Sequence, residues 1–128
     1  MEHKQLLEAI APVWDEEHNG VYIPILDCVL QLKNLSENEV TWHKAMKLAK
    51  YAGGRLFTKD EANILLWHKD AINDILKEHG GDPLASYFWS SSEYNEGNAW
   101  YVNFSSGNVS NGIKYSSYVA RAVVAFNH

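Results

Sequence analysis

The last third of the chain has the composition of a binding surface. Between residues 86 and 118, 22 of the 33 residues are Ser, Asn, Tyr or Gly, and only Glu93, Glu96 and Lys114 are charged. Tyr gives a large, rigid contact area at low entropic cost, while Ser, Gly and Asn give adaptable hydrogen bonds. The segment therefore predicts noncovalent ligand recognition. The candidate ligand-binding residues are Tyr94, Asn95, Tyr101, Asn103, Ser105, Asn108, Ser110, Asn111, Lys114, Tyr115 and Tyr118.

Within this segment, residues 100–105 alternate between apolar and polar side chains. That period is typical of a strand with one buried and one solvated face. We expect Trp89 and Trp100 on the buried face. Two roles stay open for the tyrosines of the polar face and turns, which are ligand contact and cross-strand pairing. These tyrosines are Tyr94, Tyr101, Tyr115 and Tyr118.

The reactive residue types lack the spacing that catalysis or metal binding needs. The six histidines form no pair with ligand spacing, so we expect no metal site and no cofactor. The four acidic residues between positions 60 and 74 are interpreted as the charged face of a helix. The serine run 90–92 lacks the Gly-x-Ser-x-Gly elbow, and residues 86–118 contain no histidine to act as its base. The sequence thus predicts a protein that is not an enzyme, with a hydrolase as the least favoured alternative.

The first part of the chain predicts a helical extension followed by strands. Residues 4–14 space their large apolar side chains as one face of a short helix, which Pro12 or Gly20 would end, so we assign 1–19 as an N-terminal helical extension. Residues 21–32 are apolar and partly β-branched, and Pro24 interrupts them. This run predicts two short strands or one bent edge strand.

Two helices and a set of strands are expected to hold the binding segment. The first helix begins after Thr41 and ends at Gly53-Gly54, and the second begins at Thr58 with a capping box to Glu61 and ends near residue 80. Ser106-Gly107 predicts the turn of a hairpin between 99–104 and 108–113, with Asn111-Gly112 as a competing turn. Residues 118–126 predict a final, largely buried strand.

Length and charge limit the classes of partner. The 128 residues are most simply one domain, 1–128, and the net charge is −5 without a basic groove, which disfavours nucleic acid and anionic membrane as partners. The sequence contains no apolar run of the length of a secretory signal or a membrane span, so we expect no membrane insertion. Cys28 is the only cysteine, and its apolar neighbours favour a buried, inert thiol.

Five ordered motifs carry a resemblance to a known family. In chain order they are Thr41-Trp42-x-x-Ala45, Gly53-Gly54-Arg55-Leu56-x-Thr58-Lys59-x-Glu61, Phe88-Trp89-Ser90-Ser91-x-Glu93, Ala99-Trp100-Tyr101-Val102-Asn103-Phe104-x-x-Gly107 and Arg121-Ala122-Val123-x-Ala125-Phe126. Over residues 20–126 the chain resembles the C-type lectin-like domain of bacterial and phage surface proteins. This family includes the C-terminal domain of collagen-like adhesins and variable proteins of diversity-generating retroelements.

The resemblance implies an α+β fold in which two helices pack on a small twisted antiparallel sheet and the first strand pairs with the last. It also implies ligand binding on the exposed face and loops of the late strands. In the variable proteins, adenine-targeted mutagenesis diversifies such positions toward residues that include Asn, Ser and Tyr. The Glu-Pro-Asn and Gln-Pro-Asp motifs of animal C-type lectins are absent, so calcium-dependent sugar binding is not implied.

The function that we infer from the sequence is binding of a protein or glycan ligand on a cell surface, in an adhesion or receptor role at a bacterial surface or on a phage virion. The alternative is a structural module of a surface or virion assembly without its own ligand. The neutral, aromatic late segment is also suited to a homo-oligomer interface.

Overall fold

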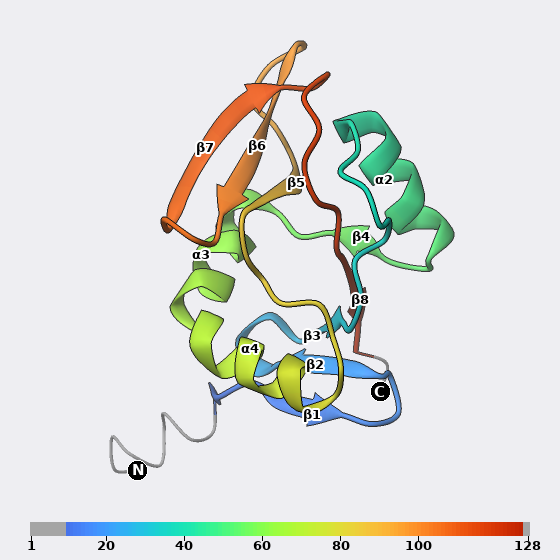
Figure 1. Cartoon of the computed structure of the whole chain (residues 1–128), viewed down its shortest axis with the longest axis vertical. Helices are drawn as coiled ribbons and strands as arrows, with labels where there is room; N and C mark the ends of the chain where they lie inside the picture. Colours follow the sequence, from blue (N-terminus) through green and yellow to red (C-terminus); the bar gives the residue numbers. More distant parts are fainter. Residues whose placement is uncertain (1–9, 127–128) are drawn as a thin grey trace.

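The computed structural model describes residues 10–126. In this part of the chain the strands form two antiparallel sheets (Figure 1). One sheet has the order β1-β2-β3-β8-β4, and the other has the order β5-β6-β7. The strands are β1 (Val13–Asp15), β2 (Gly20–Ile23), β3 (Cys28–Gln31), β4 (Arg55–Leu56), β5 (Tyr87–Glu93), β6 (Asn98–Asn103), β7 (Asn108–Ile113) and β8 (Ala122–Ala125). The α-helices of this part of the chain are α2 (Trp42–Tyr51), α3 (Lys59–Trp67) and α4 (Lys69–Glu78). Within these residues the fold is therefore α+β, with two sheets and three α-helices, where we expected one sheet with two helices packed on it besides the N-terminal helical extension.

The five-stranded sheet pairs an early segment of the chain with a late one. β3 pairs with β8, with Cys28 opposite Ala125, so the third strand rather than the first pairs with the last. The bend predicted at Pro24 is confirmed, because a 3-10 turn (Pro24–Leu26) separates β2 from β3. Asp27 then adopts a left-handed φ of 48°, which lets the chain reverse into β3.

The predicted N-terminal helix does not extend to Trp14. Residues 13–15 form β1, in which Trp14 pairs with Val21 of β2 and stacks on the His79 ring at 3.6 Å. Pro12 explains this difference, since it has no amide hydrogen to continue a helix. Residues 1–9 of the predicted extension lie outside the described part of the chain.

The predicted helix starts are confirmed, but the second predicted helix is divided. The Thr58 hydroxyl accepts a bond from the Glu61 amide at 3.1 Å, and the Glu61 carboxylate accepts one from the Thr58 amide at 2.8 Å, which completes the capping box. The chain leaves helical geometry at His68, between α3 and α4. Neither glycine nor proline marks this break, so the sequence pattern alone predicts one continuous helix.

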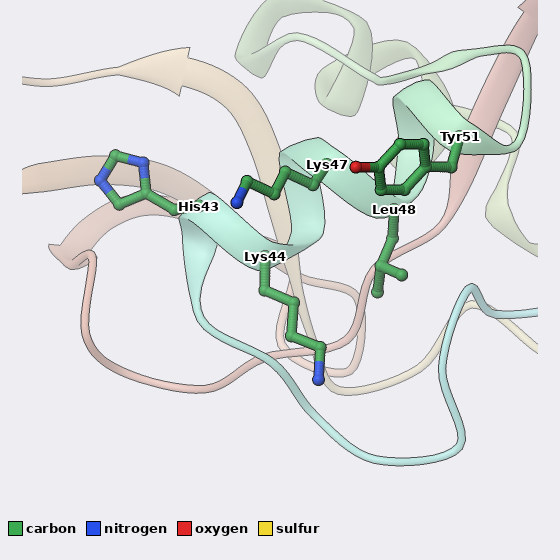
Figure 2. Close-up of a pocket in the computed structure, with 5 residues that line it drawn as sticks. All are labelled: His43, Lys44, Lys47, Leu48 and Tyr51. Carbon is green, nitrogen blue, oxygen red and sulfur yellow. The ribbon is translucent and has the colours of Figure 1, made fainter.

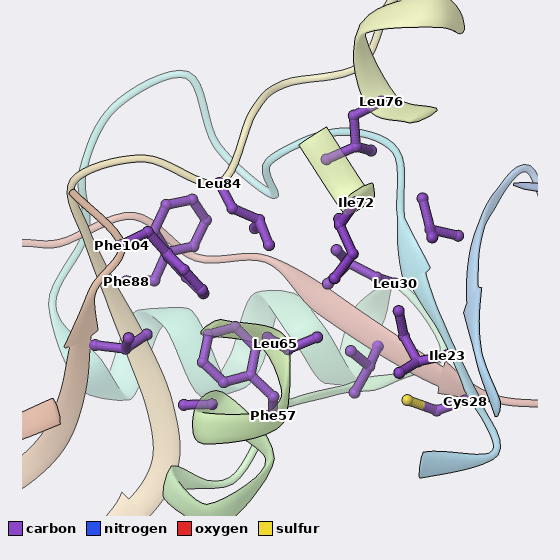
Figure 3. Close-up of a cluster of buried hydrophobic side chains, with 14 residues drawn as sticks. Ile23, Cys28, Leu30, Phe57, Leu65, Ile72, Leu76, Leu84, Phe88 and Phe104 are labelled. Carbon is purple, nitrogen blue, oxygen red and sulfur yellow. The ribbon is translucent and has the colours of Figure 1, made fainter. Parts of the chain in front are cut away.

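Two apolar clusters pack on opposite faces of the three-stranded sheet. The larger cluster joins this sheet to α3, α4 and the five-stranded sheet, and it contains Phe57, Leu65, Ile72, Phe88 and Phe104 (Figure 3). Cys28 belongs to it, and burial raises the pKa of its thiol to about 11, as expected for an inert cysteine. The smaller cluster lies between the sheet and α2 and includes Trp42, Ala45 and Trp89.

Arg121 fixes the segment that leads into β8. Its guanidinium is fully buried and donates to the Asn34 side-chain oxygen at 2.9 and 3.0 Å, to the Gln31 carbonyl at 3.0 Å and to the Asp82 carbonyl. Burial lowers the pKa of Arg121 to about 10, with the Asp82 carboxylate acting in the opposite direction. This one side chain therefore ties three distant segments together.

None of the helices among residues 10–126 combines the length and the hydropathy that a membrane crossing requires.

Candidate ligand-binding site

The strand register divides the candidate residues between the two faces of the three-stranded sheet. The hairpin turn predicted at Ser106-Gly107 is confirmed, since Asn103 pairs with Asn108 and Gly107 adopts a left-handed φ of 82°. Residues opposite each other in an antiparallel pair share a face. Tyr101 lies opposite Ser110 and Trp89, and Asn103 lies opposite Asn108 and Tyr87.

The rings of three tyrosines cluster on the sheet face that carries Tyr101 and Asn103. The ring centroid of Tyr87 lies 5.3 Å from that of Tyr101 and 5.3 Å from that of Tyr118, and Tyr101 and Tyr118 are 5.1 Å apart. The Trp89 indole is buried, and its ring centroid lies 4.5 Å from that of Tyr118. Tyr87 is exposed, and Tyr101 and Tyr118 are half-buried. We call Tyr87, Tyr101 and Tyr118, with the flanking Asn103, Asn108 and Ser110, the tyrosine face.

Gly112 provides the space that two of these rings occupy. A Cβ atom at this position would lie 3.2 Å from the Tyr118 hydroxyl and 3.3 Å from the Tyr101 ring. Contacts at that distance are tighter than most real Cβ contacts, so the rings would have to shift. A glycine near the end of β7 thus lets tyrosines from two other segments approach the strand backbone.

The local environment also shifts the acidity of Tyr118. Burial raises the pKa of its phenol, a hydrogen bond with Ser116 lowers it, and the neighbouring Tyr101, Tyr87 and Glu39 raise it, so that the net shift is upward. The phenol is therefore neutral at physiological pH and serves as both donor and acceptor.

Polar residues at the turn have structural as well as surface roles. The Asn103 side-chain oxygen accepts a bond from the Ser105 amide at 2.9 Å, and the Ser105 hydroxyl accepts one from the Ser86 amide at 3.0 Å. Asn108 is exposed beside them, and its amide donates to the Ser106 hydroxyl at 3.4 Å. The turn thus uses the Asn103 oxygen and leaves its NH2 group for other partners.

The opposite face carries a smaller set of polar and aromatic residues. Tyr94, which is 54% exposed, meets the Trp100 ring edge-on at 5.5 Å, and Asn98 donates to the Asn111 side chain at 3.0 Å. The prediction that Trp100 belongs to the core is wrong, because its side chain is only half-buried. Trp100 lies beside the start of α3, where the Lys59 ammonium covers its ring at 4.4 Å in place of an apolar layer.

Three predicted site residues lie away from both faces or have internal partners. Lys114 is 6% exposed, and its ammonium donates to the Glu96 carbonyl at 2.9 Å and lies 4.6 Å from the Trp42 ring. The Asn95 side chain accepts from the amides of Gly97 and Asn98, so it holds a turn. Tyr115 is 86% exposed on the loop after β7. The structure therefore does not support Lys114 as a surface ligand contact.

Tyr87 is not among the candidate residues that the sequence predicts. It has the same strand phase as Trp89, which the sequence places in the core, and it lies at the start of β5. The alternation of residues 87–89 was a usable signal, but only the pairing of β5 with β6 places Tyr87 beside Tyr101.

A separate hollow lies on α2 and has basic side chains in its lining. It measures about 400 Å³ on the outer side of α2 and is lined by His43, Lys44, Lys47, Leu48 and Tyr51 (Figure 2). Within residues 10–126, no group of three or more His, Cys, Asp or Glu side chains is placed to hold a metal ion.

Comparison with known proteins gives no independent assignment. No protein-family model matches the chain, and a search of curated proteins finds no match.

Proposed function

We propose that this protein is a non-enzymatic ligand-binding domain that recognises a protein or glycan on a cell surface through the tyrosine face. The observation that carries the proposal is the cluster of Tyr87, Tyr101 and Tyr118, which come from three segments and keep part of each ring in solvent. Solvated aromatic rings retain apolar area that a ligand can bury, and their hydroxyl groups can fix its orientation.

The polar residues around the rings suit a ligand with many hydroxyl or amide groups. Asn103, Asn108 and Ser110 place neutral donors and acceptors next to the aromatic cluster, and the nearby charge is that of Glu39, which acts on Tyr118. Aromatic faces pack against the C–H surfaces of sugars as well as against protein side chains. The same surface is therefore compatible with either ligand class, and the experiment below distinguishes them.

We further propose that the fold belongs to the C-type lectin-like class and that the domain acts in adhesion or receptor binding at a bacterial surface or on a phage virion. Supporting this proposal are the five ordered sequence motifs, the α+β architecture and the pairing of an early strand with the last strand. A variable protein of a diversity-generating retroelement is the narrower form of the proposal. Its test is the coding DNA, where adenine-rich Asn codons at the tyrosine face would accompany a near-identical repeat and a reverse transcriptase gene.

The binding test uses the labelled domain on a printed glycan array and on intact bacterial cells, with and without protease treatment of the cells. Glycan ligands give array signals and protease-resistant cell binding, whereas protein ligands give protease-sensitive cell binding. We expect Tyr87→Ala to lower capture at least fivefold, because the exposed ring contributes contact area while its removal leaves the core intact.

Tyr94→Ala is the matched control, since Tyr94 is similarly exposed but lies at the opposite face. We expect it to retain capture. Loss of capture in Tyr94→Ala with full capture in Tyr87→Ala would contradict the proposal. Absence of capture on both the array and the cells would favour a structural module without its own ligand.

A further inference from the structure

The outer face of α2 carries an unusual concentration of positive charge. Residues 40–59 contain five Lys or Arg and no Asp or Glu, whereas the rest of the chain has six Lys or Arg against sixteen acidic residues. Three of these five cations, Lys44, Lys47 and Lys50, are exposed on α2. The outer surface of α2 is therefore positively charged, although the protein as a whole has a net charge of −5.

The basic face surrounds the hollow of about 400 Å³ on α2. Its lining residues occupy one side of the helix, and Figure 2 shows the Lys44 side chain beside Leu48 and the Lys47 side chain beside Tyr51. Leu48 is half-buried, and Tyr51 is 83% exposed. The aliphatic stems of the lysines, Leu48 and the Tyr51 ring make the floor apolar, while the ammonium groups stay at the rim.

No carboxylate within residues 10–126 neutralises the lysines of α2, although Lys50 lies in the last turn, where the helix dipole favours a cation. Lys44, Lys47 and Lys50 form no ion pair with any residue in the range 10–126. Lys44 lies in the first turn of α2, where no acidic residue is present and where a cation opposes the helix dipole. Lys44, Lys47 and Lys50 are also spaced at three-residue intervals, at which like charges repel. Such local conflicts are expected where a surface serves a partner rather than the isolated fold.

We propose that this face of α2 is a second docking site, which binds an acidic protein segment whose apolar side chain enters the hollow and whose carboxylates meet Lys44 and Lys47. Charge complementarity defines the occupant, since the unpaired ammonium groups of Lys44 and Lys47 stand at the rim of an apolar floor and Lys50 adds a third positive charge on the same helix. This proposal does not depend on the tyrosine face.

Other anionic partners fit the face less well. An interfacial membrane helix needs a free apolar side, but Trp42, Ala45 and Ala49 of α2 are buried in the smaller core cluster. Nucleic acid binding requires a basic stripe over a larger surface, and the protein has a net charge of −5. An apolar floor of this size matches one or two side chains of a peptide.

The test is an NMR titration of the 15N-labelled protein with a library of acidic octapeptides, each carrying two Leu, Phe or Tyr residues among Asp and Glu. A second library has Asn and Gln in place of the acids. We expect saturable shifts of the amides of residues 42–51 with the acidic library alone. We expect Lys44→Glu/Lys47→Glu to weaken binding at least tenfold and Tyr51→Ala to weaken it severalfold.

Matched variants separate this site from general charge attraction. Lys44→Arg/Lys47→Arg keeps the charge and should retain binding, and Lys33→Glu/Lys77→Glu makes the same charge change at other exposed sites and should also retain it. The proposal is overturned if no acidic peptide shifts the α2 amides, or if Lys44→Glu/Lys47→Glu binds as tightly as the unaltered protein. It is also overturned if only phosphatidylglycerol vesicles, or a rise in protein concentration without peptide, shift these amides.

Discussion

The rings of Tyr87 and Tyr118 stack with their centroids 5.3 Å apart and 19° between their planes, although β6 and β7 lie between these residues in the chain. The backbone enforces this contact. The Val119 amide donates to the Tyr87 carbonyl at 2.9 Å, and Tyr118 exchanges two backbone bonds with Val40, at 2.8 and 3.0 Å. The tyrosine face is therefore built on a hydrogen-bonded scaffold, which favours a preorganised binding surface.

Gly112→Ala should impair binding without unfolding the protein. The added methyl group would lie 3.2 Å from the Tyr118 hydroxyl and 3.3 Å from the Tyr101 ring, so these two rings must move while every aromatic side chain remains. We expect a loss of affinity of about tenfold and a loss of about 1 kcal/mol in the free energy of unfolding, the low end of the cost of overpacking, because both rings are only half-buried. Parallel binding and urea denaturation experiments measure both quantities.

Gly97→Ala is the control for this variant. Its new Cβ atom would be 3.9 Å from the nearest contact, the Asn95 side-chain oxygen, so no ring is displaced. The control should bind as the unaltered protein does. Equal affinities of Gly112→Ala and Gly97→Ala would show that the spacing of Tyr101 and Tyr118 does not matter for binding.

Arg121→Ala should be among the most destabilising single substitutions. It leaves the partly buried carbonyls of Gln31 and Asp82 and the Asn34 side-chain oxygen without the Arg121 donor. We expect a loss of about 3 kcal/mol in the free energy of unfolding. A urea denaturation curve measures this loss, and a value below about 1 kcal/mol would mean that water or neighbouring groups replace the guanidinium.

Glu61 should make the stability depend on pH in the acid range. Burial raises the pKa of this carboxyl, but hydrogen bonds from Arg55, at 2.7 and 2.8 Å, and from the Thr58 amide outweigh burial and lower the pKa below its ordinary value of 4.5. A carboxyl with a depressed folded-state pKa stabilises the protein above the unfolded-state pKa, and this contribution is lost as the pH falls through the lower value.

The comparison with Glu61→Gln isolates this contribution. At pH 7 we expect the variant to be about 1 kcal/mol less stable, since it loses the charged pair with Arg55 and weakens the helix cap. At pH 3 the two proteins should approach equal stability. A stability difference that is the same at both pH values would assign the effect to shape rather than to charge.

Lys44→Glu should stabilise the isolated protein slightly. The substitution places an acid in the first turn of α2 and removes a like-charge neighbour of Lys47, so we expect a gain of about 0.5 kcal/mol. Lys77→Glu makes the same charge change in the last turn of α4, where the dipole favours a cation, and it should destabilise. Thermal unfolding of both variants checks the opposite signs, and a loss of stability in Lys44→Glu would show that Lys44 is not unfavourably placed in the first turn of α2.

The sequence predicted the features that neighbouring residues determine. The capping box of Thr58 and Glu61, the turn at Gly107 and the bend at Pro24 each depend on backbone chemistry within a few residues, and the structure contains all three. The break at His68 lacked such a local signal. Turns, bends and helix caps were therefore predictable from the sequence, whereas the number of helices was not.

The candidate site was only partly predictable because burial depends on distant pairing. Lys114 looked like a solvated cation in a neutral segment, but Trp42 and Glu96 enclose it. Tyr87 was missed because its place beside Tyr101 and Tyr118 depends on strand register and on the returning segment near Val119. Tyr101 and Tyr118 were both named from the sequence, and the structure brings their rings together.

The most direct test of the tyrosine face is NMR observation of the tyrosine rings during titration with the glycan or surface protein that the binding screen recovers. We predict saturable shifts for the rings of Tyr87, Tyr101 and Tyr118, with those of Tyr51 and Tyr94 unchanged at the same ligand concentrations. Saturable shifts confined to Tyr94 or Tyr51, with the three rings of the tyrosine face unaffected, would contradict the proposed site.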